Sequence, residues 1–159
     1  MGVMRKALCA AVLGALALPG SALAVDTPST VAGAVGSELS LAVAAPAAMT
    51  LTHSTPGTAS SLVTVTSTSP SWTLSIRDAG ATSPGVMDRV SGSGPAALSN
   101  ALEWKLSSGS YANLTSSPAT VTTGSFVATA QVDFRQALGA TENVNVADVY
   151  NLTATYTVT

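Results

Sequence analysis

Alternation of apolar and polar residues over short segments constrains this chain more than any other feature. The clearest case is the C-terminal segment, whose apolar positions are Tyr150, Leu152, Ala154, Tyr156 and Val158, separated by Asn or Thr. A period of two is the geometry of a β-strand with one buried face. Such a strand needs a second layer of structure to cover its apolar face.

Similar alternation predicts further strands at 38–43, 49–53, 62–69, 71–77, 102–106 and 126–135. Clusters of Gly, Pro and Ser separate these strands, and the longest irregular segment is expected at 80–95. A short helical turn is expected near 133–138 or 95–100. One polar face per strand favours antiparallel pairing. We therefore predict an all-β domain over residues 38–159, a two-layer antiparallel β-sandwich of about seven or eight strands with Greek-key-like connections.

The first 24 residues have the pattern of a secretory signal peptide. Arg5 and Lys6 supply a positive start, and the apolar run that follows, 7–18, is too short to span a bilayer. Ala22-Leu23-Ala24 is the small-x-small triplet that a signal peptidase accepts. The pattern predicts an exported protein, secreted or held at the cell surface.

Cleavage before Val25 leaves residues 25–37 as a leader rich in small residues, either a flexible linker or a loose first strand. Cleavage also removes Cys9, the only cysteine. The alternatives are a short buried N-terminal helix and an acylated Cys9. No second apolar run of membrane length follows, so we expect no integral membrane segment after processing.

The composition excludes several classes of function. Charged residues make up 9% of the 159 residues, against roughly 25% in an ordinary domain, and the formal net charge is -2. Nucleic-acid binders carry clustered basic residues, so nucleic acid is not an expected partner. One Cys and one His exclude a zinc site of the usual kind and a disulfide scaffold, and no cofactor is expected.

Two segments carry a family resemblance. Ser71-Trp72-Thr73-Leu74 precedes a terminal element in which Tyr150, Ala154, Thr155, Tyr156 and Val158 stand at spaced positions. This arrangement resembles the WxL domain of Gram-positive secreted proteins, which pairs a Trp-x-Leu with a C-terminal Tyr-x-x-x-Leu-Thr-Trp-x-Leu. Trp104-Lys105-Leu106 is an additional Trp-x-Leu triplet.

The resemblance covers residues 70–159. It implies an exported surface domain that attaches non-covalently to the cell wall, to peptidoglycan. The partners it implies are a cell-wall glycan or other surface proteins.

Four aromatic residues are the candidates for glycan contact, because the apolar face of a sugar ring packs on an aromatic ring. Trp72, Trp104 and Tyr156 alternate with polar residues beside other apolar side chains, so core packing is the favoured interpretation for these three. Tyr111 follows the turn 107–110, which predicts the most exposed ring. Tyr111 is therefore the best single candidate.

Catalysis has little support in the sequence. His53 is the only histidine, and no Gly-x-Ser-x-Gly elbow surrounds a serine. Asp78, Asp88, Glu103 and Asp133 each lie one or two residues from Arg or Lys, which is typical of solvated surface pairs. A calcium site from Asp78 and Asp88 is an alternative, but the required set of oxygen ligands is not visible. We expect no enzyme.

Wall binding or surface display is therefore the predicted function. The alternative is a structural subunit that assembles into an extracellular fibre or sheath, because strands with few charges leave their edges weakly guarded. In that alternative the leader acts as a donated strand. A wall-active hydrolase is the third and weakest hypothesis.

Overall fold

The computed structural model describes residues 34, 36–80 and 83–159. The signal peptide predicted at 1–24 and most of the leader predicted at 25–37 lie outside the described residues. Within that part, the domain contains eleven strands and no helix. All strand pairs are antiparallel, and the sheets pack together as a β-sandwich, which confirms the predicted fold class.

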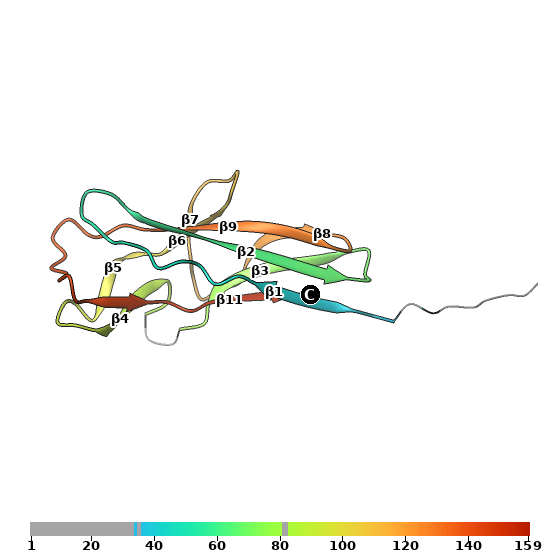
Figure 1. Cartoon of the computed structure of the whole chain (residues 1–159), viewed down its shortest axis with the longest axis horizontal. Coiled ribbons are helices and arrows are strands. Elements are labelled where there is room, and N and C mark those ends of the chain that lie inside the picture. The colour runs from blue at the N-terminus through green and yellow to red at the C-terminus, as the bar shows by residue number, and fades with distance from the viewer. Residues whose placement is uncertain (1–33, 35, 81–82) are drawn as a thin grey trace, which may run out of the picture. The chain divides into compact units, whose positions relative to one another are not determined.

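The first layer is a five-stranded sheet (Figure 1). Its strands, in spatial order, are β1 (Leu39–Val43), β2 (Gly57–Ser67), β9 (Ala128–Gln136), β6 (Glu103–Leu106) and β7 (Ala112–Asn113). The chain leaves this sheet after β2. It returns first as β6 and β7 and later as β9, which lies between β2 and β6. β1 and β7 are its two edges.

The second layer consists of two three-stranded sheets. One has the order β11 (Ala154–Val158), β3 (Trp72–Asp78), β8 (Ala119–Gly124), and the other β10 (Val149–Asn151), β4 (Val86–Ser91), β5 (Ala97–Ala101). Figure 1 shows β4 and β5 beyond the end of β3 and β11. The second layer is therefore divided between two separate sheets.

The alternation seen in the sequence becomes alternation in burial. In β3, Trp72, Leu74 and Ile76 are buried, and in β2 every second residue is buried along the whole strand. The core joins both layers, and its members include Val63, Val65, Trp72, Leu74, Ile76, Trp104, Val132 and Phe134. Burial of such side chains stabilises a fold by roughly 1.5–3 kcal/mol each.

The two segments that carry the family resemblance are neighbours in one sheet. β11 runs antiparallel to β3, with Tyr156 opposite Ile76 and Val158 opposite Leu74. Residues far apart in the sequence thus share the same apolar surface.

Several predicted boundaries are wrong. Residues 49–53 alternate as predicted but form no strand, because no neighbouring strand pairs with them. The segment 80–95 contains β4, and the places predicted for a helical turn lie in β9 and β5. Cross-strand pairing overrides the local Gly and Ser content in these segments.

Two long strands also differ from their predictions. The C-terminal alternation is divided between β10 and β11, which belong to different sheets. Phe126 lies before β9 with a positive φ of 52° and a 57% exposed side chain. Its carbonyl accepts a hydrogen bond from the indole N–H of Trp72 at 3.1 Å, so the turn at Phe126 anchors a core residue.

Substitution of Gly124 tests this packing. A Cβ atom at Gly124 would lie 2.6 Å from Cη2 of Trp72. We expect Gly124→Ala to lower the free energy of unfolding by about 1–3 kcal/mol, measured by urea denaturation. In a Trp72→Phe background, which lacks these ring atoms, the same change should cost much less. Gly109→Ala is the control, because its nearest contact is 3.5 Å away; equal losses at Gly124 in both backgrounds would contradict the argument.

Candidate functional site

Two of the four candidate aromatic residues lie in the core, and a third packs against it. The side chains of Trp72 and Trp104 are 4% and 7% exposed. Tyr156 is half-buried against the same core, and burial raises the pKa of its phenol to about 12. Among the described residues its hydroxyl makes no hydrogen bond of normal geometry, although the Ser61 hydroxyl, which donates to the carbonyl of Ala44 at 2.6 Å, lies near it. These rings support the domain from inside.

Tyr111 lies on the outer face of the five-stranded sheet, just before β7. Trp104 pairs with Ala112, so Lys105 and Tyr111 are the next opposed positions, on the face away from the core. The guanidinium carbon of Arg135 lies 4.1 Å from the ring centroid of Tyr111, and Lys105 Nζ lies 5.0 Å from it. The ring is half-buried because these cationic side chains cover part of it.

The charges around this ring are balanced and held in place. Arg135 donates a hydrogen bond from Nε to Oε2 of Glu103 at 2.7 Å, and its Nη2 lies 2.7 Å from the same oxygen in an ion pair. Asp133 accepts hydrogen bonds from Gln131 and Ser60, both at 2.8 Å. These hydrogen bonds, with that from Gln131 contributing most, lower the pKa of Asp133.

We refer to Tyr111, Lys105, Arg135, Glu103 and Asp133 as the Tyr111 cluster. It presents two cations, two carboxylates and an aromatic ring on one sheet face. Such a set offers hydrogen-bond donors and acceptors in fixed positions beside an apolar surface, which suits a polyhydroxylated ligand.

Sequence reasoning found Tyr111 but missed how its neighbours pair. The sequence suggested local pairs, such as Glu103 with Lys105. Glu103 instead lies opposite Arg135 on the adjacent strand, and Lys105 lies opposite Asp133. The signal was the alternation of both strands, which puts all four charges on one face, but the register was needed to match them.

Asp78 is a clear correction. The sequence suggested a solvated partner of Arg77, but Asp78 is 3% exposed. Its two oxygens accept hydrogen bonds from the backbone amides of Gly80 and Gly85, each at 2.7 Å. Both oxygens are therefore engaged within the β3–β4 connection, which argues against the calcium alternative with Asp88.

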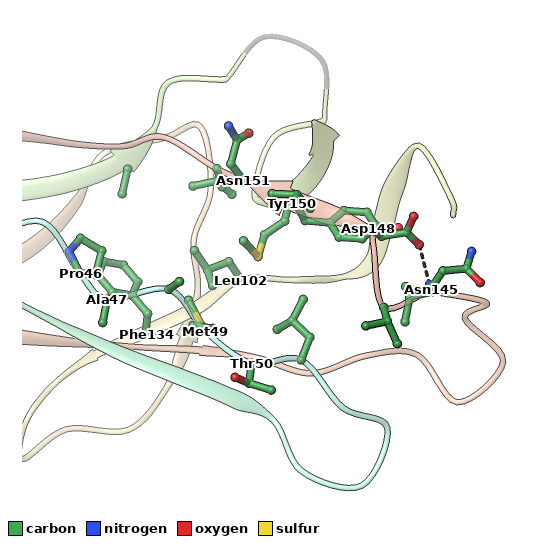
Figure 2. Close-up of a pocket in the computed structure, with 18 residues that line it drawn as sticks. Pro46, Ala47, Met49, Thr50, Leu102, Phe134, Asn145, Asp148, Tyr150 and Asn151 are labelled. Atoms are coloured by element: carbon green, nitrogen blue, oxygen red, sulfur yellow. Dashed lines mark hydrogen bonds between the residues drawn. The ribbon is translucent and has the colours of Figure 1, made fainter. Parts of the chain in front are cut away.

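A separate apolar groove lies between the two layers (Figure 2). Its volume is about 650 Å³. One wall is the segment Pro46–Leu51 and the other is β10 with residues 144–148, while Leu102 and Phe134 lie between the walls. No sequence pattern predicted this groove, because its two walls come from segments near opposite ends of the domain.

Of the described residues that line the apolar groove, Asp148 alone is charged. Its carboxylate accepts hydrogen bonds from the backbone amides of Asn145, Gly94 and Ser93, at 2.6, 3.0 and 2.7 Å. These bonds, with that from Asn145 contributing most, lower the pKa of Asp148. Asp148 thus holds the backbone at the rim of the groove in place through these three hydrogen bonds.

The remaining candidates do not form a reactive site. His53 Nε2 donates a hydrogen bond to the carbonyl of Glu142 at 2.8 Å, which joins two loops. In the described ranges, no group of three or more His, Cys, Asp or Glu side chains is arranged to hold a metal ion. The same residues include no helix long and apolar enough to cross a membrane.

No protein-family model, curated protein or solved structure matches this chain. The resemblance to the WxL domain therefore rests on the motif residues alone.

Tyr156 gives a prediction about pH. Because burial raises its pKa from 10.0 to about 12, the unfolded chain ionises first. The stabilising effect is complete below pH 10 and is lost as the pH rises toward 12. We expect Tyr156→Phe to match the parent in urea denaturation at pH 7, where the hydroxyl makes no bond, and to lose less stability than the parent in this alkaline range. A parallel alkaline loss in both proteins would contradict this.

Proposed function

We propose that this domain is an exported, non-catalytic module that binds cell-wall glycan, the glycan strands of peptidoglycan, through the Tyr111 cluster. The observation that carries the proposal is the position of Tyr111. It is the candidate aromatic residue whose ring lies on a sheet face rather than in the core, and fixed charged groups surround it.

The chemistry of the cluster fits a glycan better than an anionic polymer. Arg135 is neutralised by Glu103, and Lys105 lies opposite Asp133, so the face has no net charge to attract phosphate. Carboxylates and guanidinium groups held by neighbouring side chains can each accept from or donate to sugar hydroxyls. The neutral Ser and Thr side chains on the same sheet leave the surrounding surface free of competing charge.

Binding without hydrolysis is the simplest form of this proposal. Glycoside hydrolysis uses two carboxyl groups on either side of the scissile bond, and one of them needs a raised pKa. In the Tyr111 cluster, Glu103 is held in an ion pair with Arg135, and hydrogen bonds lower the pKa of Asp133. Neither carboxyl group is prepared to act as a general acid.

Sedimentation with purified, protein-free cell wall tests the proposal. We expect the processed domain to sediment with wall material and Tyr111→Ala to bind about tenfold more weakly, equivalent to ~1.4 kcal/mol. Thermal unfolding of both proteins checks that the change does not unfold the domain.

Phe126→Ala is the matched control, because Phe126 is another exposed aromatic residue but lies at the β8–β9 turn outside the cluster. It should bind wall as the parent does. Equal binding by Tyr111→Ala and the parent would exclude the cluster as the site. A parent protein that stays in the supernatant would exclude wall binding itself.

A further inference from the structure

The apolar groove resembles the space that remains where a β-strand is absent between two neighbouring segments. One wall, Pro46–Leu51, continues from the edge strand β1, and the other contains the edge strand β10. No hydrogen bond within the described residues reaches the backbone of Pro46–Leu51, and β10 pairs on one side only, with β4. Two segments that lack backbone partners on at least one side thus line a shared apolar space.

A strand placed in this space could form backbone hydrogen bonds with both walls. Backbone amides and carbonyls need partners when they are buried, and an added strand supplies them along its whole length. Six residues in a strand span about 20 Å, so an added strand of about six residues would match the number of residues in the wall Pro46–Leu51. The exposed Val146 (109%) and Val149 (53%) add apolar contact area at the rim.

We propose that the segment Thr27–Ser37 of a second copy of this chain occupies the apolar groove as an added β-strand. This proposal is independent of glycan binding, since the Tyr111 cluster lies on the outer face of the five-stranded sheet.

The chemistry of the segment matches the groove. Thr27–Ser37 contains no charged residue and lies between Asp26 and Glu38. Its centre, Val31–Val35, alternates Val or Gly with Ala, so small apolar side chains face both sides of a strand. The groove is mainly apolar, and its one charged residue, Asp148, is already occupied by backbone amides.

The reach of the chain favours a second copy over the segment's own domain. Glu38 is fixed to Thr68, with which it exchanges hydrogen bonds at 2.9 and 3.0 Å. The near end of the groove, Pro46, lies eight residues after Glu38 and three residues beyond the end of β1 at Val43. Val31 is seven residues before Glu38, so a segment folded back at Glu38 would bring Val31 no further than about Ala45. Residues 32–35 would then lie beside β1, outside the groove of their own domain.

The described end of the segment also leaves its own domain. Ala34, Gly36 and Ser37 are exposed, and a Cβ at Gly36 would meet nothing within 4 Å. These exposed residues leave the described end of the segment accessible to another copy. Repetition of this contact is head-to-tail and produces open chains of domains rather than closed dimers.

Cysteine cross-linking between two differently tagged proteins tests the proposal. Both proteins are expressed from the full chain with Cys9→Ser, so that neither has a native cysteine whether or not the first 24 residues are removed. One protein carries Gly33→Cys in the segment, and the other carries Val146→Cys at the groove rim. We expect a disulfide-linked heterodimer on mild oxidation of the mixture. The matched control is Leu62→Cys, which is 51% exposed on the outer sheet face and should not cross-link with Gly33→Cys.

Light scattering of the cysteine-free protein gives the second measurement. The mean mass should rise with concentration, and Val31→Asp with Val35→Asp should abolish the rise, because a charge in the apolar groove is costly. Tyr111→Ala should leave it unchanged.

Each alternative occupant gives a distinct result that would overturn the proposal. A monomer at every concentration would mean that the groove takes a different protein or nothing. A Gly33→Cys, Val146→Cys double variant that closes a disulfide within one chain would mean that the segment folds back onto its own domain. Equal cross-linking to Leu62→Cys would mean random collision.

Discussion

The structure depends on one constraint: every long strand has a single apolar face, and that face must be buried. Trp72, Leu74 and Ile76 from one layer and Val63, Val132 and Phe134 from the other meet this requirement together. Neither layer is stable alone, because half of its surface would expose apolar side chains to water. The outer faces are then free to carry whatever chemistry function requires.

The two surfaces of interest follow from this division. The Tyr111 cluster lies on the outer face of the five-stranded sheet, where β9 and β6 place their second set of side chains. The apolar groove lies where the core reaches the sheet edges, beside β10 and the segment after β1. A face suits a polar ligand because it is wet and ordered, whereas an open edge suits another strand because it has unpaired backbone groups. The two proposals therefore concern different parts of one sandwich, an ordered polar face and an open strand edge.

The sequence predicted burial correctly where local alternation was strong. It failed to predict strands and side-chain partners that depend on pairing between distant segments. The burial of Trp72 and Trp104 followed from the alternation of their own strands. The strand predicted at 49–53 does not form, although its residues alternate. Alternation shows which side chains share a face, but it does not show whether a neighbouring strand is present to pair with the segment. Asp78 was misjudged for a related reason: proximity to Arg77 in the sequence says nothing about the amides of Gly80 and Gly85, which the loop brings to its carboxylate.

The sequence by itself determined that this chain is a β protein with an apolar face on each strand, a scarcity of charge and a Tyr positioned in a turn. These properties are local, since a period of two and a composition can be read without knowing any neighbour. The tertiary structure alone decided that Arg135 stacks on Tyr111, that Glu103 pairs with Arg135, and that a groove opens beside β10. Each of these depends on the register between strands distant in the sequence, and a shift of one residue would turn every side chain to the opposite face.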